Sequence, residues 1–330
     1  MSASSSLPST MRAAVHTAYG PPEVVHLMDV PVPTPRAGEL LVKVHATTVN
    51  RTDSGFRTGK PLIVRPYAGF LRPKRTRPGC EYAGTVAALG TGVQRFSVGD
   101  RVFGFTEDDR FGAHAEYVCV NAEGAVALQP EGHDHAACAP LCEGAHYALC
   151  DLRAADVGPG QQVLVNGATG AIGSAAVQLA RHLGATVTAV ADTLNMALVR
   201  SLGATTVIDR LKEDFIQSKE RFDLVFDAVG KSCFGRCKPL LKPKGIYLST
   251  ELGPWLQNPL LAMLTPLLGG KRVLFPVPKI TQADAELFAS LAAAGSYRPV
   301  IDRCYPLEQI VEAHRYVDSG EKVGNVVVVV

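Results

Sequence analysis

The feature that most constrains this fold is an apolar segment that ends in a glycine-rich turn and continues as an apolar helix, VLVNGATGAIGSAAVQLA (163–180). It predicts a strand up to Asn166, a turn, and a helix with apolar side chains at helical spacing. The turn has the pattern A-x-G-x-x-G and consists of Ala168, Thr169, Gly170, Ala171, Ile172 and Gly173. Glycines at these positions let the backbone approach a pyrophosphate and let the helix pack close to the strand. Because a helix N-terminus also offers N–H groups to phosphate, the segment predicts a dinucleotide-binding site.

An acidic residue, Asp192, ends the second apolar strand of this region, about 20 positions after Gly173. The dinucleotide-binding fingerprint has a carboxylate there, where it accepts hydrogen bonds from the ribose hydroxyls. We therefore expect Asp192 to bind the cofactor together with Thr193 and Asn195. The alternative is that Asp192 caps the next helix and does not meet a ribose, since Asp is a favoured N-cap residue.

The rest of the chain has two patterns. Up to about residue 128, short strands rich in Val and Ala are separated by Gly, Pro and Asp turns, which predicts a compact barrel-like β domain. After about residue 130, strands alternate with helices, which predicts a parallel sheet covered on both faces. A chain of 330 residues is long enough for both domains. The expected fold class is α/β, with a doubly wound parallel sheet domain and a β-barrel domain.

Composition narrows the partners and the compartment. A net charge of +2 gives no general attraction to nucleic acid or anionic membranes. The nearest candidate for a membrane span, residues 254–270, is broken by Pro259 and Pro266. Residues 1–10 lack a signal-peptide core, and we expect them to be a flexible lead. Eight cysteines without a secretory signal indicate free thiols in a reducing cytoplasm.

One basic cluster lies in the segment FLRPKRTRPG (70–79) and consists of Arg72, Lys74, Arg75 and Arg77. A charge run of this kind is usually a solvated loop. The alternative is a rim that attracts an anionic ligand.

Several longer motifs resemble one enzyme family. They are VKVHATTVNRTD (42–53), RPGCEYAGTVAALGTGVQRFSVGDRVFGF (77–105), NGATGAIGSAAVQLARHLGA (166–185), SLGATTVID (201–209), FDAVG (226–230) and EAHRYVDSGEKVGNVVV (312–328). Together they resemble the medium-chain dehydrogenase/reductase superfamily, most closely its zinc-free quinone oxidoreductase and enoyl-reductase-like branch. The resemblance runs from about Met11 to the C-terminus.

This resemblance implies a GroES-like catalytic domain built from residues 1–128 and 281–330, with a Rossmann dinucleotide-binding domain at residues 129–280. The apolar strand GNVVVVV would then return to the first domain and would not extend the parallel sheet. The resemblance also implies that Asn325, in the turn VGN, approaches the nicotinamide. Val229, in the loop DAVG, would lie below the dinucleotide.

The zinc site of related alcohol dehydrogenases is incomplete in this sequence. Asn50 stands where zinc-dependent relatives carry a cysteine, and Cys80 replaces a histidine, whereas Glu81 and Cys142 keep ligand types. A catalytic zinc needs three protein ligands and an open position, and an amide is a poor zinc ligand. The segment 106–117 also lacks the four cysteines of a structural zinc lobe. We therefore expect no metal.

A second group of metal-type side chains comprises His133, His135, Cys138 and Cys142. Asp134 precedes an Ala-rich run and predicts a helix N-cap. That helix would turn the two cysteines toward the core, so we expect no metal here either.

A metal-free site can pass a hydride from a reduced nicotinamide to a quinone or an α,β-unsaturated carbonyl, because the developing charge is delocalised onto an oxygen. The protein must then position the acceptor and place donors near that oxygen. The resemblance suggests Asn50 and Asp53 for this role, with His146 and Tyr147 from EGAHYAL (143–149). Each could instead be a satisfied polar group in a cleft wall. Trp255 and the leucines after it favour a bulky apolar acceptor.

Two other functions stay open from the sequence alone. One is a zinc-dependent alcohol dehydrogenase with an atypical ligand set. The other is a dinucleotide-binding protein without enzymatic activity, such as a crystallin, a scaffold or an RNA-binding protein. The near-neutral net charge argues against RNA as the main ligand.

For the cofactor, we expect NAD(H), with NADP(H) as the alternative. Members of this branch that favour NADPH carry a small residue at the end of the second strand and a basic residue soon after it. Here these positions hold Asp192 and Leu194, and a carboxylate would repel a 2′-phosphate. Arg200 is the only basic residue expected nearby, and about two helical turns separate it from Asp192.

For partners, we expect a small-molecule substrate, no nucleic acid and no membrane. We also expect a homodimer, because Rossmann sheets of this superfamily commonly pair edge to edge. The segment KRVLF (271–275) could supply the edge strand, which needs covering if it is apolar.

Overall fold

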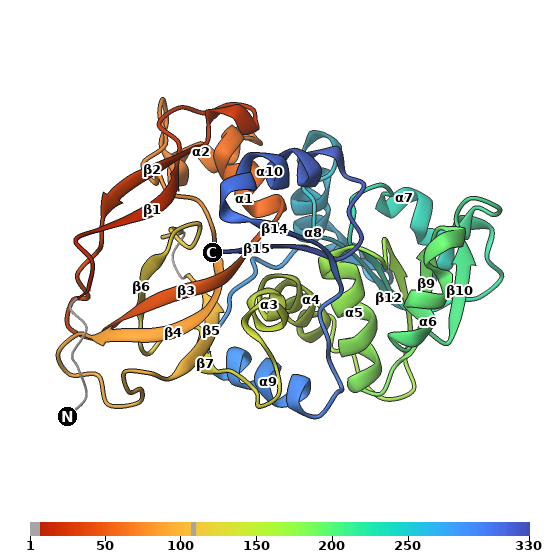
Figure 1. Cartoon of the computed structure of the whole chain (residues 1–330). Coiled ribbons are helices and arrows are strands. Elements are labelled where there is room, and N and C mark those ends of the chain that lie inside the picture. The colour runs from red at the N-terminus through yellow and green to blue at the C-terminus, as the bar shows by residue number, and fades with distance from the viewer. Residues whose placement is uncertain (1–6, 107–109) are drawn as a thin grey trace. The chain divides into compact units, whose positions relative to one another are not determined.

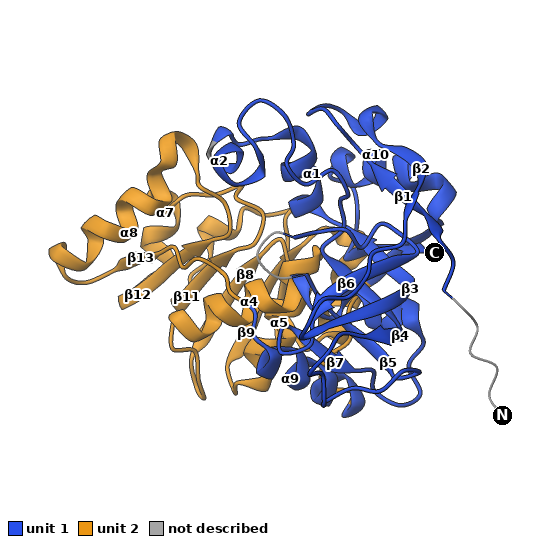
Figure 2. Cartoon of the chain, turned by 90° about the vertical axis from the view of Figure 1, so that its left-hand side faces the viewer, with its two compact units in different colours: residues 1–143, 280–294, 301–330 blue, residues 144–279, 295–300 orange. Residues whose placement is uncertain are grey.

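The computed structural model describes residues 7–106 and 110–330. The chain divides into two compact units, which we call unit 1 (residues 1–143, 280–294 and 301–330) and unit 2 (residues 144–279 and 295–300) (Figure 2). Relative to the boundaries expected from the sequence, residues 129–143 lie in unit 1 and residues 295–300 lie in unit 2.

Unit 2 is built around a parallel sheet of six strands in the order β10-β9-β8-β11-β12-β13. Figure 1 labels β9, β10 and β12 of this sheet. The strands are β8 (Gln162–Asn166), β9 (Thr186–Ala191), β10 (Thr206–Asp209), β11 (Phe222–Asp227), β12 (Leu241–Ser249) and β13 (Arg272–Leu274). The helices are α4 (Glu143–Ala154), α5 (Ala171–His182), α6 (Met196–Ser201), α7 (Phe234–Cys237) and α8 (Gln257–Leu268). The strand order reverses between β8 and β11, and ligands of such sheets bind outside the carboxyl ends of the strands at this point.

Unit 1 contains a seven-stranded sheet in the order β14-β15-β3-β4-β5-β7, with β6 paired to β3, and a separate β1-β2 hairpin. The strands are β1 (Thr10–Val15), β2 (His26–Pro31), β3 (Glu39–Val49), β4 (Glu81–Leu89), β5 (Arg101–Phe105), β6 (Tyr117–Asn121), β7 (Val126–Leu128), β14 (Ile301–Pro306) and β15 (Asn325–Val329). The helices are α1 (Arg51–Thr58), α2 (Arg65–Ala68), α3 (His135–Cys138), α9 (Gln282–Ala293) and α10 (Ile310–Ser319).

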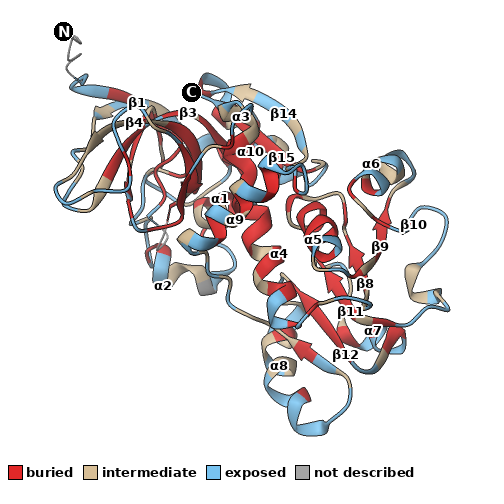
Figure 3. Cartoon of the chain, turned by 90° about the horizontal axis from the view of Figure 1, so that it is seen from below, coloured by how far each residue is buried: buried red, intermediate tan, exposed pale blue. Residues whose placement is uncertain are grey.

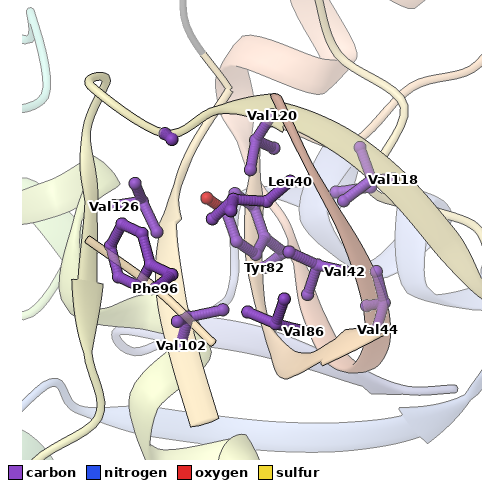
Figure 4. Packing of buried hydrophobic residues seen from close by; sticks show 12 residues of the cluster. Leu40, Val42, Val44, Tyr82, Val86, Phe96, Val102, Val118, Val120 and Val126 are labelled. Carbon is purple, nitrogen blue, oxygen red and sulfur yellow. The ribbon is translucent and has the colours of Figure 1, made fainter. Parts of the chain in front are cut away.

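The sheet of unit 1 encloses a core of valines around one tyrosine (Figure 4). Tyr82 is fully buried there, and Val42, Val86 and Val102 pack around it from β3, β4 and β5. β-branched side chains suit this position, because they fit the half-buried surface of a pleated sheet.

The C-terminal strand belongs to the sheet of unit 1. β15 pairs antiparallel with β3, with Val326 opposite Val49 and Val329 opposite Ala46. β14 pairs with the other edge of β15 in parallel orientation. The last strand therefore joins the N-terminal sheet and does not extend the parallel sheet of unit 2.

Prolines mark two helices of unit 2. α7 is short, because Pro239 and Pro243 follow it and proline cannot continue a helix. The apolar run at 254–270 forms α8, which keeps Pro266 inside it and carries many exposed residues (Figure 3). In the part of the chain that the structure describes, no helix combines the length and the hydropathy that a bilayer span requires.

Candidate active site

At two positions of the glycine turn between β8 and α5, contacts within the chain leave room only for glycine. Gly167 has a φ of +79°, and a Cβ there would lie 2.4 Å from Val229 Cγ1. A Cβ at Gly173 would lie 2.0 Å from the Gly167 carbonyl oxygen. A Cβ at Gly170 would meet that same oxygen at 3.7 Å, which is ordinary contact. Packing within the chain thus explains Gly167 and Gly173 but not Gly170, and a ligand that approaches the backbone would explain the third glycine.

The first turn of α5 is available to an anion. Gly170 is its N-cap residue and provides no side-chain hydrogen bond to the first turn. Ser174 N donates to the Gly170 carbonyl (2.8 Å), where the regular helical bonds begin. The preceding N–H groups and the helix dipole fit a pyrophosphate. The turn therefore has the geometry that a dinucleotide needs, with Ala168, Thr169, Ala171 and Ile172 in the surrounding backbone.

A buried carboxylate, Asp227, holds the neighbouring loop against the glycine turn. It accepts hydrogen bonds from four donors: Asn166 Nδ2 (2.9 Å), Ser232 N (2.8 Å), Tyr247 OH (3.2 Å) and Val229 N (3.4 Å). These bonds join the ends of β8 and β11 and place Val229 beside Gly167. Val229 thus lies beside the glycine turn, and its contact with a dinucleotide stays a prediction.

Asp192 follows β9 at the carboxyl edge of the sheet. It occupies an N-cap position, but its carboxylate makes no capping hydrogen bond. Its Oδ1 accepts from Asn195 Nδ2 (2.6 Å) and its Oδ2 from Arg210 Nη2 (3.3 Å). The helix-capping alternative therefore lacks its defining bond. Thr193 Oγ1 donates to Asp209 Oδ2 (2.6 Å), which ties the same turn to the end of β10.

The expectation that Arg200 is the only basic residue near Asp192 is wrong. Arg200 is exposed on α6, whereas Arg210 forms an ion pair with Asp192. β10 runs parallel to β9 with Asp209 opposite Ala191, so the residues that follow the two strands are neighbours. The sequence alone carries no signal for this register, so it could not identify Arg210.

In unit 1, Asn50 and Asp53 form a capping box at the start of α1. Asp53 N donates to Asn50 Oδ1 (3.0 Å), and Asn50 N donates to Asp53 Oδ2 (3.1 Å). Asn50 Nδ2 also donates to Cys80 Sγ (3.0 Å), and Gly79 N donates to Asp53 Oδ1 (3.0 Å). Burial raises the pKa of Asp53 to about 7. Both residues therefore join α1 to the segment before β4, and their catalytic role stays a prediction.

Glu81, at the start of β4, is fully buried and anchors two other segments. Its Oε1 accepts from Cys142 N (3.0 Å) and Glu143 N (2.6 Å), and its Oε2 accepts from Thr48 Oγ1 (2.6 Å). Burial, with Glu143 nearby, raises the pKa of Glu81 to about 8. This carboxyl group therefore fastens β4 to β3 and to the start of α4.

These side chains do not fit a catalytic zinc. The Glu81 carboxyl group is already used by three donors of the protein, and Cys80 Sγ accepts a hydrogen bond from Asn50. Among residues 7–106 and 110–330, no three or more His, Cys, Asp or Glu side chains form a group that could hold a metal ion. Near His133 and His135, Asp134 caps α3 through Ala137 N (2.7 Å), as the sequence predicted.

Glu143, which the sequence did not single out, is a buried acid at the start of α4. Thr52 Oγ1 donates to its Oε1 (2.8 Å), so it is linked to the first turn of α1. Burial raises the pKa of Glu143 to about 6. A carboxyl group with this pKa can exchange a proton near neutrality.

His146 and Tyr147 lie on α4, and the first turn of α4 contacts the glycine turn. A Cβ at Gly144 would lie 2.7 Å from the Ala171 carbonyl oxygen, so only glycine allows this close approach. His146 is buried, and its ring centroid lies 4.5 Å from that of Tyr147. Asn325, the remaining expected site residue, is the buried first residue of β15 in unit 1.

Comparisons with known proteins place this fold and this turn in one family. A model of the alcohol dehydrogenase GroES-like domain matches residues 36–130, and a zinc-binding dehydrogenase model matches residues 202–328. The NADPH-dependent alkenal/one oxidoreductase, chloroplastic, of Arabidopsis thaliana is 30% identical over 342 residues, covering 99% of this chain and 82% of that protein. The quinone oxidoreductase of Sus scrofa is 32% identical over 319 residues, covering 90% of each. The solved quinone oxidoreductase from Coxiella burnetii has a TM-score of 0.87 at 28% identity, covering 97% of this chain and 99% of that chain.

The chain therefore belongs to the medium-chain dehydrogenase/reductase superfamily. Within it, the chain falls in the quinone oxidoreductase branch, and it is an oxidoreductase that uses a nicotinamide cofactor and a small-molecule substrate. The expected fold class, a Rossmann-type parallel sheet with a GroES-like β domain, is confirmed.

Proposed function

We propose that this protein transfers a hydride from a reduced nicotinamide dinucleotide to a quinone or an α,β-unsaturated carbonyl without a catalytic metal. The observation that carries the proposal is the glycine turn, in which Gly170 has no packing reason inside the chain to be glycine. The names of the relatives support the acceptor class, because one is named for alkenals and enones and two for quinones. The hydrogen bonds that occupy Glu81 support independence from zinc.

The bound dinucleotide supplies the hydride, and the chain supplies binding and orientation. The first turn of α5 would hold the pyrophosphate, Asp192 the ribose, and Asp227 the loop that places Val229 beside the turn. Asn325 would approach the nicotinamide.

The acceptor needs donors near its developing oxyanion and a source of one proton. Asn50, His146 and Tyr147 are our candidates for the donors. Asp53 and Glu143 are buried acids with raised pKa values, about 7 and about 6, and each can hold that proton.

The test is oxidation of NADH and NADPH by the purified protein, with a panel of quinones and enones, before and after chelation. We expect turnover with at least one acceptor and no loss after chelation. A stoichiometric zinc whose removal abolishes turnover would favour an alcohol dehydrogenase with an atypical ligand set. Tight binding of the dinucleotide with no turnover across the panel would favour a non-enzymatic protein.

For the cofactor, the proposal is a preference for NADH over NADPH. The Asp192 carboxylate can accept hydrogen bonds from two ribose hydroxyls, and it would repel a 2′-phosphate. Arg210 pairs with Asp192 at 3.3 Å and weakens that repulsion without removing the carboxylate. The preference should therefore be moderate, and the ratio of kcat/KM for the two cofactors measures it.

For the assembly, the proposal is a homodimer formed at the β13 edge of unit 2. β13 has no further strand on its outer side among the described residues. The exposed side of α8 carries an apolar stripe at helical spacing: Leu260, Met263, Leu264, Leu267 and Leu268. Trp255, which is 96% exposed, precedes this helix. An exposed stripe of this kind favours an interface over a substrate pocket.

Light scattering at micromolar protein concentration tests the dimer. Met263→Glu with Leu267→Glu should give monomers, whereas Leu194→Glu, at a residue 93% exposed elsewhere, should not. A wild-type monomer would contradict the proposal. None of the eight cysteines, all of which lie among the described residues, forms a disulfide, which is compatible with the cytoplasm that we propose as the compartment.

A further inference from the structure

A pocket in unit 1 combines basic and aromatic side chains from segments far apart in the sequence. Its lining includes His16 after β1, Phe56 and Arg57 of α1, Arg75 and Arg77 of the basic segment, and Phe111. We propose that this pocket binds an oxyanion: a carboxylate, sulfonate or phosphate group. No role described above uses these residues.

The pocket is held by backbone hydrogen bonds. His16 N donates to the Thr76 carbonyl (2.8 Å), which fixes the basic segment against the end of β1. His114 N donates to the Pro78 carbonyl (3.1 Å), and Gly79 N donates to Asp53 Oδ1 (3.0 Å). Arg75 and Arg77 of this segment both line the pocket. Part of the segment therefore lines the pocket, although most of its residues, Arg75 included, are exposed.

Among residues 7–106 and 110–330, the arginines that line the pocket differ in how their charges are compensated. Arg57 is fully buried, pairs with Asp318, and donates from Nη1 to the Gly20 carbonyl (2.7 Å), so its charge is compensated. Arg75 and Arg77 have no ion-pair or hydrogen-bond partner for their side chains among residues 7–106 and 110–330. Two guanidinium groups that line the same pocket offer the fork geometry that matches an oxyanion.

The rest of the lining favours an oxyanion attached to an apolar body. The rings of Phe56 and Phe111 lie 4.5 Å apart and form an apolar side beside the arginines. Burial lowers the pKa of His16, which keeps its side chain neutral, and its Nδ1 donates to the Ala18 carbonyl (3.3 Å), so the ring adds no charge to the pocket. A quinone or enone with an acidic substituent has this combination of groups.

Two sources share this chemistry. The oxyanion can be an acidic group of the acceptor, which rests on the proposed function, or a free inorganic anion. α1 connects the pocket to the candidate catalytic residues, because Asn50 and Asp53 lie at its start and Phe56 and Arg57 near its end. The distance along the helix is on the order of 10 Å, within reach of a bicyclic acceptor.

The test compares two double variants of the same segment. Arg75→Gln with Arg77→Gln removes two charges from the pocket. Arg72→Gln with Lys74→Gln removes two charges from exposed neighbours that do not line it. General electrostatic attraction would change equally in both, whereas a built site responds only to the first pair.

The first arm measures kcat/KM for 1,4-naphthoquinone-2-sulfonate divided by kcat/KM for 1,4-naphthoquinone. Comparing this ratio between proteins cancels the intrinsic reactivity of the two quinones. We expect the pocket variant to lower the ratio about tenfold, because hydrogen bonds between charged groups are lost. The control variant should stay within about twofold of wild type, as expected for screened surface charges.

The second arm measures the thermal midpoint in sodium sulfate and sodium phosphate against sodium chloride at equal ionic strength. One outcome is that sulfate raises the thermal midpoint of wild type and of the control variant but not that of the pocket variant, while the ratio for the two quinones is the same in all three proteins. This outcome would support the pocket and assign it to a free anion. If wild type reduces neither of these quinones, the wider panel of quinones and enones decides the proposed function, and this arm still decides the pocket. Equal behaviour of the two double variants in both arms would overturn the proposal.

Discussion

The glycine turn of unit 2 and the polar cluster around Glu81 in unit 1 both resemble functional motifs of one family, but the chain uses them differently. In the turn, packing within the protein does not require a glycine at position 170. The first N–H groups of α5 receive no side-chain cap from Gly170. In the cluster, Glu81 accepts three hydrogen bonds from the chain and Asp53 accepts two. Groups that the fold has already satisfied hold the structure together, and groups that it leaves available bind ligands.

The largest expected effect tests the structural role of Glu81. Glu81→Ala leaves three buried donors without an acceptor, and should lower the free energy of unfolding by about 3 kcal/mol or more. Glu81→Gln keeps the acceptor for Cys142 N and Glu143 N and should lower it much less. Urea unfolding measures both, with Glu123→Ala at an exposed position as the control. If Glu81→Ala leaves the free energy of unfolding unchanged and instead loses a bound metal, our interpretation of the cluster is wrong.

The second prediction compares substitutions at two glycines of the turn, Gly173 and Gly170. Gly173→Val forces a side chain against the Gly167 carbonyl and should cost about 1–3 kcal/mol of stability together with dinucleotide binding. A Cβ at Gly170 meets no close atom of the chain, so Gly170→Val should cost less stability than Gly173→Val. The dissociation constant of Gly170→Val for the dinucleotide should nevertheless rise at least about tenfold, because the side chain enters the space of the phosphates. Thermal unfolding and fluorescence titration separate the two effects, and unchanged affinity in Gly170→Val would contradict the site.

Cofactor preference is the next smaller effect. Asp192→Ser removes the carboxylate and releases Arg210 for a 2′-phosphate, so one substitution should shift the ratio of kcat/KM about tenfold toward NADPH. Adding Arg210→Ala should cancel that gain. A wild-type ratio that already favours NADPH would mean that the Asp192–Arg210 pair opens in the complex and that our NADH proposal is wrong.

The last prediction is a pH dependence. Burial raises the pKa of Glu81 from 4.5 to about 8, so the folded state keeps a proton that the unfolded state releases within this range. The stability that this group contributes is therefore complete below about pH 4.5 and falls as the pH rises to about 8. Glu81→Gln should not show this decrease. The free energy of unfolding of Glu81→Gln should therefore rise relative to that of wild type between these pH values. Parallel curves would indicate that Glu81 is ionised in the folded protein.

The sequence was most informative where local pattern and function coincide. The strand, turn and helix at 163–180 follow from apolar spacing and glycine positions, and the structure contains them as β8, the turn and α5. The apolar tail at 324–330 forms β15, and KRVLF contains β13 at the edge of its sheet. Local propensity and tertiary packing agree at these places.

What could not be predicted depends on contacts between distant segments. Arg210 reaches Asp192 only through the register of two parallel strands, and the oxyanion pocket joins residues 16, 57, 75 and 111. The role of Glu81 was hidden for the same reason, because its partners come from β3 and from the residues before α4. Periodicity and motif spacing carry no information about such pairs.

The central claim is that reduced nicotinamide bound at the glycine turn reduces an activated acceptor without metal. The most direct measurement uses NADH carrying deuterium at the transferable C4 position, an enone acceptor, and protein whose metal content has been measured after exhaustive chelation. The account predicts metal-free turnover with deuterium retained on the β-carbon of the product, and loss of that product in Gly170→Val. Turnover that appears only when zinc is restored, or a product without deuterium on that carbon, would contradict it.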